Sequence, residues 1–425
     1  MDKDKSIISL LQKYRQEHLI EDISLLNTDE KDSLLKQLKL IDQFYPCLSF
    51  SDKIALEEPL SPFTRCNQRR DADDRLANRA VQEGRIGIIL LAGGEGTRLG
   101  FSKPKGMFPI SVLKNKTLFQ IFSEKIFYAQ KKYQKRLYLS VMVNPQSKGL
   151  IMSFFKENNF FGLQESQVDF FCQQMTPFFT EENKWFWEKK GKIAEGTEGN
   201  GGVFYHFCKS PVFKKWQNLN IDTVNILSID NPLADPFDEK MLALHIKENA
   251  DVTMCAIVAE KNKKRGGLAY VNGTARVLEY FYLEQKKLPI FFSNTGIYLV
   301  RLCYIAKVFE KPLPLHKVKK KTKKWTVEER VSAYKYERFI FDAFAFTDRV
   351  SVFLGKKNEC FSPLKELKDL EVVKEAMVKK DKKILKELLQ FETEKKNVEI
   401  SQEFYYPTED FLAMCKNNPK KNLFF

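Results

Sequence analysis

The sequence predicts an α/β protein with a doubly wound, mostly parallel sheet, a helical segment before it and a small appendage after it. The first observation is an abrupt apolar run at 86–92, because a run without alternation is typical of a strand buried on both faces of a parallel sheet. The second is the recurrence of such runs between helical segments. The third is a glycine-rich loop directly after the first run. Together they indicate a Rossmann-like sheet that binds its ligand beyond the carboxyl ends of its strands.

The N-terminal segment is predicted to be helical because apolar residues recur at helix-like spacings. Leu10, Leu11 and Tyr14 form one such group. A second helix is expected to begin at Asn27-Thr28-Asp29-Glu30, which has the residue types of a helix break and a new N-cap. Residues 46–80 follow as a connector that ends in a short helix.

Predicted strands and helices then alternate along the chain. The expected strands are the apolar runs 86–92, 137–143, 168–171, 224–229 and 252–258, and the expected helices include 117–134 and 236–249. Residues 267–300 are predicted to form antiparallel strands with a turn at Asn272-Gly273. Residues 364–392 are predicted to be helical, and short β-like pieces close the chain. These patterns suggest three domains, which are an N-terminal helical segment (1–80), a central domain (81–345) and a short C-terminal domain (346–425).

Composition and charge narrow the classes of function. The 425 residues include no run of ~18 apolar residues, so no membrane span is expected. Eight scattered cysteines without a C-x-x-C pair, and only four histidines, argue against a zinc site or a disulfide scaffold and indicate a reducing cytoplasm. The net charge is +15, and much of the excess lies in short runs such as the lysines of 319–324, which we interpret as a solvated loop. We expect no nucleic-acid or membrane partner, and a monomer.

The loop after the first predicted strand carries the strongest functional signal. It reads Leu91-Ala92-Gly93-Gly94-Glu95-Gly96-Thr97-Arg98-Leu99-Gly100 and continues to Pro104-Lys105-Gly106-Met107. Glycines let a backbone approach a phosphate closely and present N–H groups to it. Arg98 and Lys105 supply positive charge for a triphosphate. The spacing fits neither the dinucleotide-binding fingerprint nor the Walker A motif.

The whole string G-G-x-G-T-R-L-G-x3-P-K resembles the signature of the sugar-nucleotide pyrophosphorylases. With Pro-Lys-Gly-Met after it, the string is similar to that of the eukaryotic UDP-N-acetylglucosamine pyrophosphorylases, and the resemblance extends over roughly residues 10 to 405. It implies a GT-A-like nucleotidyltransferase domain that joins UTP to N-acetylglucosamine 1-phosphate and releases diphosphate, supplying chitin or glycan precursors. It also implies that Leu91, Ala92, Gly93 and Gly94 bind the nucleotide, and that Arg98 and Lys105 are catalytic.

Two further segments resemble the uridine-binding side of the family. The segment Phe171-Cys172-Gln173-Gln174-Met175-Thr176-Pro177 implies that Gln173 reads the uracil edge, since a carboxamide both donates and accepts hydrogen bonds. The loop Glu195-Gly196-Thr197-Glu198-Gly199-Asn200-Gly201-Gly202 resembles P-D-G-N-G-G, in which the first glycine packs on uracil and the asparagine contacts the sugar. The resemblance therefore assigns Gly199 and Asn200. Gln174 replaces a usual glycine, and Thr197 and Glu198 replace Pro and Asp.

A carboxylate at the end of the apolar strand 224–229 is the metal candidate. Asp230 follows this strand directly, and a carboxylate in that position can hold Mg²⁺ (or Mn²⁺) while the metal bridges triphosphate oxygens. The resemblance adds residues for the sugar phosphate, which are Asn200, Gly267, Glu279, Tyr280, Asn294 and Lys365. It also implies that Lys335, in the segment Lys335-Tyr336-Glu337-Arg338, contacts the nucleotide phosphates as a catalytic residue.

Three alternatives remain open from the sequence. The nearest keeps the fold and changes the acceptor to glucose 1-phosphate or a broad set of sugar phosphates. A second is a non-catalytic nucleotide-binding module, although such a module would be expected to lose Arg98, Lys105 or Asp230, and all three are present. The third, nucleic-acid binding, rests only on the positive charge.

Overall fold

The chain folds into two compact units. The computed structural model describes residues 2–44, 59–64, 66, 73–94, 96–260, 265–417 and 423–424. Unit 1 combines Met1–Leu56, Gln173–Val203 and Pro312–Asp342, and unit 2 combines Glu57–Cys172, Phe204–Lys311 and Ala343–Phe425. Much of the expected connector at 46–80 lies outside the described residues. The domain boundaries expected after residues 80 and 345 stay predictions.

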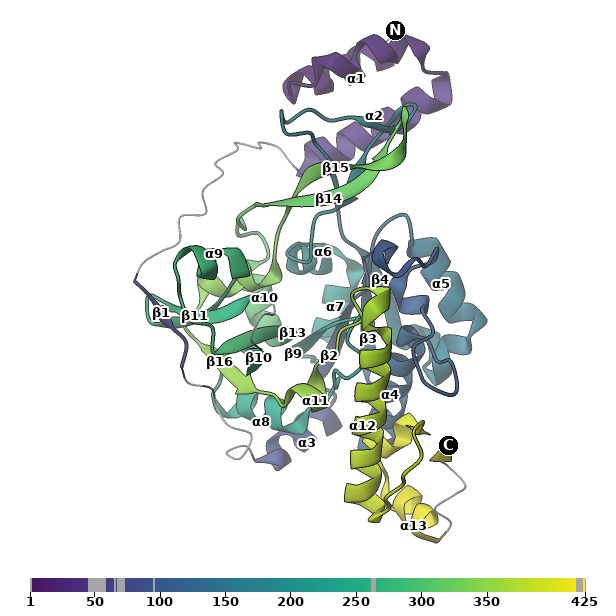
Figure 1. The fold of residues 1–425 in the computed structure, drawn as a ribbon, viewed down its shortest axis with the longest axis vertical. Coiled ribbons are helices and arrows are strands. Elements are labelled where there is room, and N and C mark those ends of the chain that lie inside the picture. The colour runs from purple at the N-terminus through teal and green to yellow at the C-terminus, as the bar shows by residue number, and fades with distance from the viewer. Residues whose placement is uncertain are drawn as a thin grey trace. The chain divides into compact units, whose positions relative to one another are not determined.

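Unit 2 contains the central sheet, which has ten strands in the described part of the chain (Figure 1). The path through the sheet is β1-β11-β13-β9-β2-β3-β4, with β12 paired to β11 and β10 paired to both β13 and β16. The strands are β1 (Leu60–Pro62), β2 (Ile86–Leu91), β3 (Tyr138–Val143), β4 (Val168–Cys172), β9 (Thr223–Ser228), β10 (Val252–Val258), β11 (Gly267–Val271), β12 (Thr274–Leu278), β13 (Phe292–Arg301) and β16 (Val350–Leu354).

The order of the parallel strands reverses next to β2, and this reversal creates a switch point. The strands β9, β2, β3 and β4 are parallel to one another, as are β10 and β16, whereas β13 runs antiparallel to β9 and β10. From β2 the chain moves to β3 and then β4 on one side, and it later returns to place β9 on the other side of β2. Ligands bind at such reversals, outside the carboxyl ends of the strands. The predicted α/β class and mostly parallel central sheet are confirmed.

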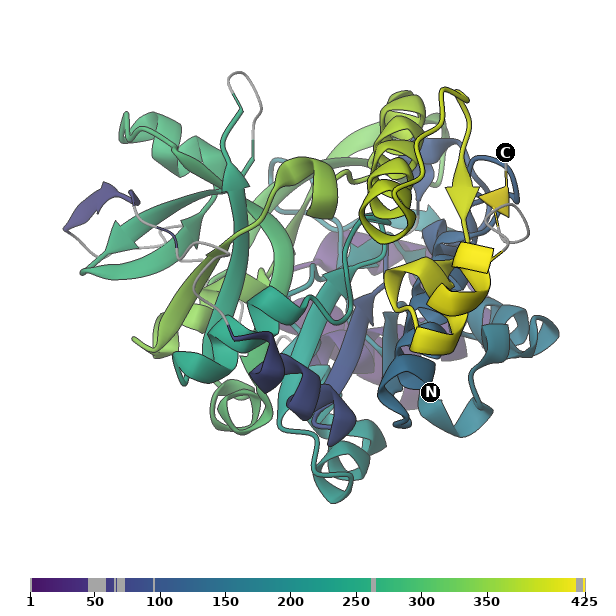
Figure 2. The same ribbon diagram turned by 90° about the horizontal axis from the view of Figure 1, so that it is seen from below.

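Helices cover both faces of this sheet (Figure 2). Helix α4 begins after Thr117, whose hydroxyl accepts a hydrogen bond from the backbone N–H of Gln120 at 3.2 Å, and its residues Phe119 and Phe122 are fully buried. The described α-helices that follow the N-terminal segment, whether or not they cover the sheet, are α3 (Asp74–Gln82), α4 (Leu118–Tyr133), α5 (Lys148–Glu157), α6 (Val203–Lys209), α7 (Pro211–Asn218), α8 (Glu239–Lys247), α9 (Tyr280–Gln285), α10 (Leu302–Val308), α11 (Lys357–Cys360), α12 (Leu370–Leu389) and α13 (Glu409–Asn417). None of the described helices combines the length and apolar character that a membrane span needs.

Three predicted elements differ from the structure. The antiparallel region 267–300 is interrupted by α9, which begins at Tyr280, so Glu279 and Tyr280 lie at a helix start rather than on a strand. The closing β-like pieces, β17 (Glu399–Ile400) and β18 (Leu423–Phe424), pair with each other but are separated by α13. The lysine run at 319–324 is not a loop, because it lies in strand β14 (His316–Lys324).

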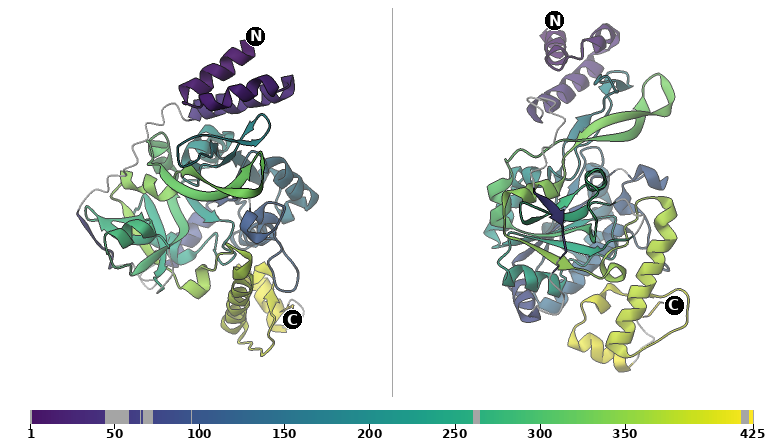
Figure 3. Two further views of the ribbon diagram at one scale, coloured as in Figure 1. Left: turned by 45° about the horizontal axis from the view of Figure 1, so that its top comes forward. Right: turned by 60° about the vertical axis from the view of Figure 1, so that its left-hand side comes forward.

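Unit 1 joins the N-terminal helices to several short strands and one long strand pair (Figure 3). Its helices are α1 (Asp2–Lys13) and α2 (Thr28–Phe44), and its strands are β5 (Met175–Pro177), β6 (Trp187–Lys189), β7 (Lys192–Ile193), β8 (Glu195–Thr197), β14 and β15 (Val327–Glu337). The break before α2 is a reciprocal cap, because Asn27 and Glu30 each accept the other's backbone N–H at 2.9 Å. Leu11, Leu38 and Trp185 belong to the buried cluster that unites these segments.

Candidate functional site

The carboxyl ends of β2 and β9 lie side by side at the switch point. Leu91 is paired with Ser228, and the N–H of Ile229 donates to the carbonyl of Leu91 at 3.1 Å. This register brings the glycine loop that follows β2 and the carboxylate that follows β9 to the same edge of the sheet.

The glycine loop is anchored at its start and open beyond it. The N–H of Ala92 donates to the carbonyl of Met142 at 2.8 Å, and the amide of Asn144 donates to the carbonyl of Gly93 at 3.0 Å. Gly96 has a φ of +68°, a conformation that glycine adopts without strain. A methyl group on Gly94 would meet no atom within 4 Å, so its backbone is accessible to a ligand.

Lys105 points toward Asp230. Its Nζ lies 3.9 Å from Oδ2 of Asp230 and donates to the carbonyl of Leu364 at 3.1 Å, and only 12% of its side chain is exposed. Burial lowers the pKa of Lys105, the Asp230 carboxylate opposes this effect, and the positive charges of Arg98 and Lys365 lower the pKa further. Two positive charges and the carboxylates of Asp230 and Asp369 thus act on the Lys105 ammonium group.

Arg98 and the backbone of Lys365 are held by an acidic turn after residue 364. The carboxylate of Asp369 accepts from the N–H groups of Lys365 and Glu366, at 3.0 and 2.8 Å. A guanidinium nitrogen of Arg98 lies 3.8 Å from the Glu366 carboxylate, and 64% of the Arg98 side chain is exposed. Lys368, and to a smaller extent Arg98, lower the pKa of Glu366. Of the predicted residues in unit 2, Lys105 therefore contacts Asp230, Arg98 pairs with Glu366, and the backbone of Lys365 is held by Asp369.

Asp230 is a suitable ligand for a metal ion that is also bound by the substrate phosphates. Its carbonyl accepts from the N–H of Leu364 at 2.8 Å, which fixes the backbone, and its side chain is 20% exposed. Across the described residues, no group of three or more His, Cys, Asp or Glu side chains could enclose a metal ion. Mg²⁺ is commonly held by one or two carboxylates together with substrate phosphates and water, so a single carboxylate is a suitable donor set for it.

The predicted uridine-side loop belongs to unit 1 and is tied to the segment after β15. Glu198 is 2% exposed, and its carboxylate accepts from the N–H of Gln174 and from the guanidinium of Arg338, both at 3.0 Å. Gly199 has a φ of +91°, and a Cβ there would lie 2.4 Å from the carbonyl oxygen of Arg338. Glu198 therefore supports the loop, and only glycine fits at position 199.

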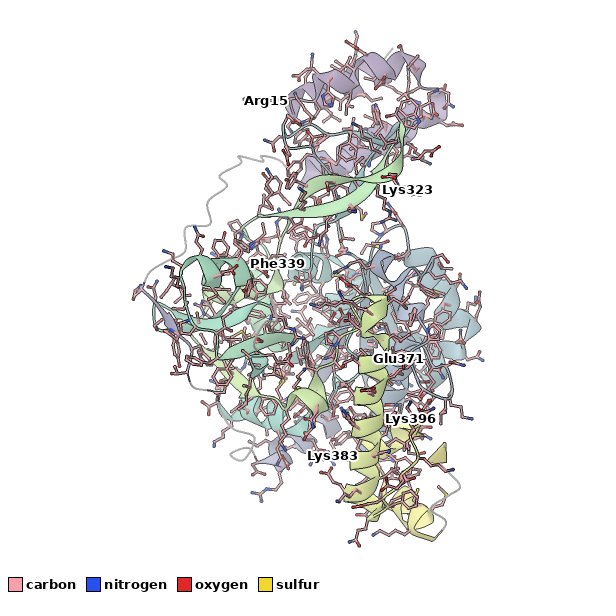
Figure 4. All side chains as sticks on the ribbon, in the orientation of Figure 1. Arg15, Lys323, Phe339, Glu371, Lys383 and Lys396 are labelled. Carbon is pink, nitrogen blue, oxygen red and sulfur yellow. The ribbon has the colours of Figure 1, made fainter. Side chains whose placement is uncertain are left out.

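Asn200 and Lys335 are engaged by protein groups in the same unit. The side-chain oxygen of Asn200 accepts from the N–H of Ile340 at 3.1 Å, in the segment that contains Phe339 (Figure 4). Lys335 is 4% exposed, and its ammonium donates to the carbonyl of Thr197 and pairs with Glu337 at 2.9 Å. Contact with a phosphate would require Lys335 to share or exchange these partners. Gln173, 4% exposed, directly follows β4.

The predicted sugar-side residues of unit 2 already have partners or packing roles. The amide of Asn294 donates to the Tyr298 hydroxyl at 2.6 Å, and the hydroxyl of Tyr280 donates to Glu284 at 3.2 Å. A Cβ on Gly267 would lie 2.7 Å from the Ile290 side chain, so close packing explains this glycine. Glu279 is half-buried immediately before α9.

Sequence reasoning missed Asn144 and Glu366. Asn144 supports the glycine loop through Gly93, and Glu366 is the ion-pair partner of Arg98. A signal for Asn144 was present, because it directly follows the predicted strand at 137–143 and so must lie at the same sheet edge. No comparable signal identified Glu366, whose role depends on a contact with a residue 268 positions earlier.

Residues 54–422 match the model of a protein family described as UTP–glucose-1-phosphate uridylyltransferase. The chain belongs to this family. Among curated relatives of this uridylyltransferase-family chain, UDP-N-acetylglucosamine diphosphorylase 2 of Arabidopsis thaliana is 26% identical, covering 85% of this chain and 80% of the relative. UDP-N-acetylhexosamine pyrophosphorylase-like protein 1 of Mus musculus is 27% identical, covering 86% of this chain and 81% of the relative.

A solved structure shares the uridylyltransferase fold of this chain. The uridine diphosphate N-acetylglucosamine pyrophosphorylase from Trypanosoma brucei superimposes with a TM-score of 0.75 at 24% identity, covering 92% of this chain and 87% of that one. The family match confirms the resemblance to the sugar-nucleotide pyrophosphorylases, and together with this superposition it confirms the predicted nucleotidyltransferase fold.

Proposed function

We propose that the protein is a uridylyltransferase that converts UTP and N-acetylglucosamine 1-phosphate to UDP-N-acetylglucosamine and diphosphate, a precursor supply for chitin or glycans in the cytoplasm. The reaction class rests on one observation, which is that Lys105 contacts Asp230 beside the open glycine loop. Both lie at the switch point of the sheet in a chain of the uridylyltransferase family. The choice of sugar is supported by relatives named for UDP-N-acetylglucosamine and UDP-N-acetylhexosamine.

The site suits in-line attack of one phosphate on another. An oxygen of the sugar phosphate forms a bond to the α-phosphorus of UTP, the bond to the diphosphate breaks, and its electron pair leaves with the diphosphate. The attacking group is already an anion, so no general base is needed. Arg98 and Lys105 neutralise the charge on the α-phosphate and the diphosphate, and Lys365 neutralises the incoming phosphate. Positioning and charge neutralisation account for most of the rate in such reactions.

Asp230 would hold Mg²⁺ (or Mn²⁺) together with the substrate phosphates. When bound, the metal would act as a Lewis acid that neutralises negative charge on the substrate phosphates. The contribution of the chain itself is to fix the Asp230 backbone through Leu364 and to hold Lys105 nearby. The proposal further assigns uracil recognition to Gln173 and Gly199.

The sugar end of the substrate is assigned to a second group of residues. In the proposal, hydroxyl or acetamido groups of the sugar contact Asn200, Glu279, Tyr280 and Asn294. Gly267 has no separate role there, because its packing against Ile290 explains it. Lys335 would reach the nucleotide phosphates by exchanging its present partners.

Diphosphate release with different acceptors tests the proposal. The purified protein is incubated with UTP, Mg²⁺ and one of three acceptors, which are N-acetylglucosamine, N-acetylgalactosamine or glucose 1-phosphate. We expect the highest kcat/KM with N-acetylglucosamine 1-phosphate. A preference for glucose 1-phosphate, or none, would favour the UDP-glucose or broad-specificity alternative. UTP binding without diphosphate release from any acceptor would favour the non-catalytic module.

Alanine substitutions test the two charges at the centre of the site. Arg98→Ala and Asp230→Ala should each lower kcat by ~10²–10³-fold, since each removes one preorganised charge. Arg75→Ala and Asp348→Ala are matched controls on exposed positions of unit 2, with 90% of each side chain accessible. A variant at position 98 or 230 with kcat like its control would show that the role is wrongly assigned.

A further inference from the structure

The segment that follows Asp230 is buried but lies outside any helix or strand. Backbone carbonyls in such a segment need donors from elsewhere, because an unpaired buried carbonyl is costly. The carbonyl of Asp230 accepts from Leu364, and that of Asn231 accepts from the N–H of Ala234 at 3.0 Å. The side chain of Asn225 donates to the carbonyls of Asp235 and Pro236, at 3.4 and 2.9 Å.

The three carbonyls in the middle of this segment are all satisfied by lysines. Nζ of Lys125, on α4, donates to the carbonyls of Pro232 and Ala234, both at 2.7 Å. Nζ of Lys380, on α12, donates to the carbonyl of Leu233 at 2.8 Å. Helix α12 is the long helix on which Glu371 and Lys383 are marked (Figure 4).

Both ammonium groups are enclosed by the C-terminal part of the chain. Lys125 is 1% exposed, and Nζ of Lys125 and of Lys380 lie 5.4 and 5.1 Å from the ring centroid of Tyr405. The Tyr405 hydroxyl donates to Asp381 on α12 at 2.7 Å, and that of Tyr406 donates to Asp235. Burial lowers the pKa of Lys125 to about 7.

Packing alone does not account for this arrangement. An apolar side chain would fill the same space without the cost of burying an ammonium group, but it would leave the carbonyls of Pro232–Ala234 unpaired. Lysines have three donors and a long flexible stem, so two of them can reach three successive carbonyls from two different helices. The two lysines thereby restrain the chain immediately after the carboxylate of the site.

We propose that Lys125 and Lys380 are positioning residues for uridylyl transfer, which hold the Pro232–Ala234 carbonyls and so fix the Asp230 carboxylate. The inference rests on the proposed function of Asp230. It makes α12 and the segment around Tyr405 a support of the transfer site rather than an appendage. Neither lysine touches substrate in this proposal, and each acts through the backbone of the Asp230 segment.

Substitution of Lys380 by methionine tests the proposal, with Lys379→Met as the control on an exposed neighbour of α12. Methionine keeps much of the volume and removes the donors. We expect at least a tenfold lower kcat, at least a threefold higher Mg²⁺ concentration for half-maximal rate, and a Tm within a few degrees of wild type. Amide hydrogen exchange measured by mass spectrometry should be faster at residues 231–235 than in Lys379→Met.

Lys380→Arg tests the role of the donors more directly. Lys380 borders a cavity of about 120 Å³, which offers room for a guanidinium group. We expect Lys380→Arg to recover most of the kcat and the slow exchange, because it restores a donor for the Leu233 carbonyl. Lys125→Met, at the buried position, should reproduce the exchange and Mg²⁺ changes of Lys380→Met.

The outcomes separate this inference from the proposed function. Wild-type protein that releases no diphosphate contradicts the proposed function. The rate of amide hydrogen exchange at 231–235 in Lys380→Met still tests whether the lysine restrains this segment, because that measurement does not depend on activity. Unchanged exchange together with kcat within twofold of Lys379→Met overturns the inference. A Lys380→Met protein that does not fold, or that loses Tm while keeping normal kcat, assigns the lysine to stability alone and overturns it as well.

Discussion

His245 on α8 is a buried histidine that should make stability depend on pH. It is 1% exposed, and its Nδ1 lies 2.8 Å from the Thr253 hydroxyl. Burial, with a smaller contribution from Arg301, lowers the pKa of His245 to about 3. Between pH 3 and 6.5 the unfolded chain binds a proton that the folded chain excludes, so stability rises with pH there and is lost as pH falls. At pH 5 this group should contribute a loss of about 2 kcal/mol relative to pH 7.5.

Urea unfolding at pH 7.5 and pH 5.0 measures this loss. His245→Gln should lower stability at pH 7.5 but show a smaller drop between the two pH values than wild type. His206→Gln is the control, because His206 is only half-buried. An equal drop in wild type and His245→Gln would mean that His245 does not titrate as its burial requires.

At the residue level, motif residues could be predicted and supporting residues could not. The spacing of the glycine loop indicated Arg98 and Lys105, and the strand end indicated Asp230, because these residues have fixed offsets from predicted elements. Lys125 shows no such signal. Lysine is ordinarily exposed, and its burial here follows only from the packing of α4 against the Asp230 segment.

The 3-10 helix Lys105–Met107 depends on glycine at its centre. A Cβ at position 106 would lie 2.3 Å from the ring of Phe119, which is fully buried on α4. Gly106→Ala should therefore destabilise the protein by ~1–3 kcal/mol through overpacking. It should also lower kcat, because the displaced loop carries Lys105.

Gly149→Ala in α5 is the matched control for Gly106→Ala. A Cβ at position 149 would meet nothing within 4 Å, so alanine should stabilise the protein by ~0.4–1 kcal/mol. Urea unfolding and kcat of both variants distinguish the two sites. Equal stability of Gly106→Ala and wild type would show that the Phe119 ring can move aside.

At the element level, the strands predicted from apolar runs match the structure to within a residue, whereas β16 of the central sheet and the lysine-rich β14 were missed. The run 86–92 became β2 (Ile86–Leu91), and 252–258 became β10, because strands buried on both faces need continuous apolar sequence. Strand β14 contains mostly lysine and has no apolar alternation. Its structure comes from pairing with β15, a partner that periodicity cannot identify.

At the level of the whole molecule, the sheet class could be predicted but the two units could not. The alternation of elements implied a parallel sheet, whereas the return of β9 beside β2 is a long-range pairing across more than a hundred residues. Unit 1 is assembled from three separate stretches of chain, so no linear boundary predicts it. Local patterns specify elements, and side-chain contacts far apart in the sequence decide which elements share a core.

Gln16 tests how these separate stretches hold unit 1 together. It is 4% exposed, its amide donates to the carbonyls of Tyr14 and Asn183 at 2.9 and 3.2 Å, and its oxygen accepts from the N–H of Trp185 at 2.8 Å. Gln16→Ala leaves a buried N–H unpaired, which should cost about 1–3 kcal/mol in urea unfolding. Gln12→Ala, on the exposed face of α1, should cost less than about 0.5 kcal/mol. If the two variants unfold at the same urea concentration, Gln16 is not needed to hold the first stretch of unit 1 to the second, and the apolar cluster and other hydrogen bonds such as that between Trp187 and Asp22 suffice.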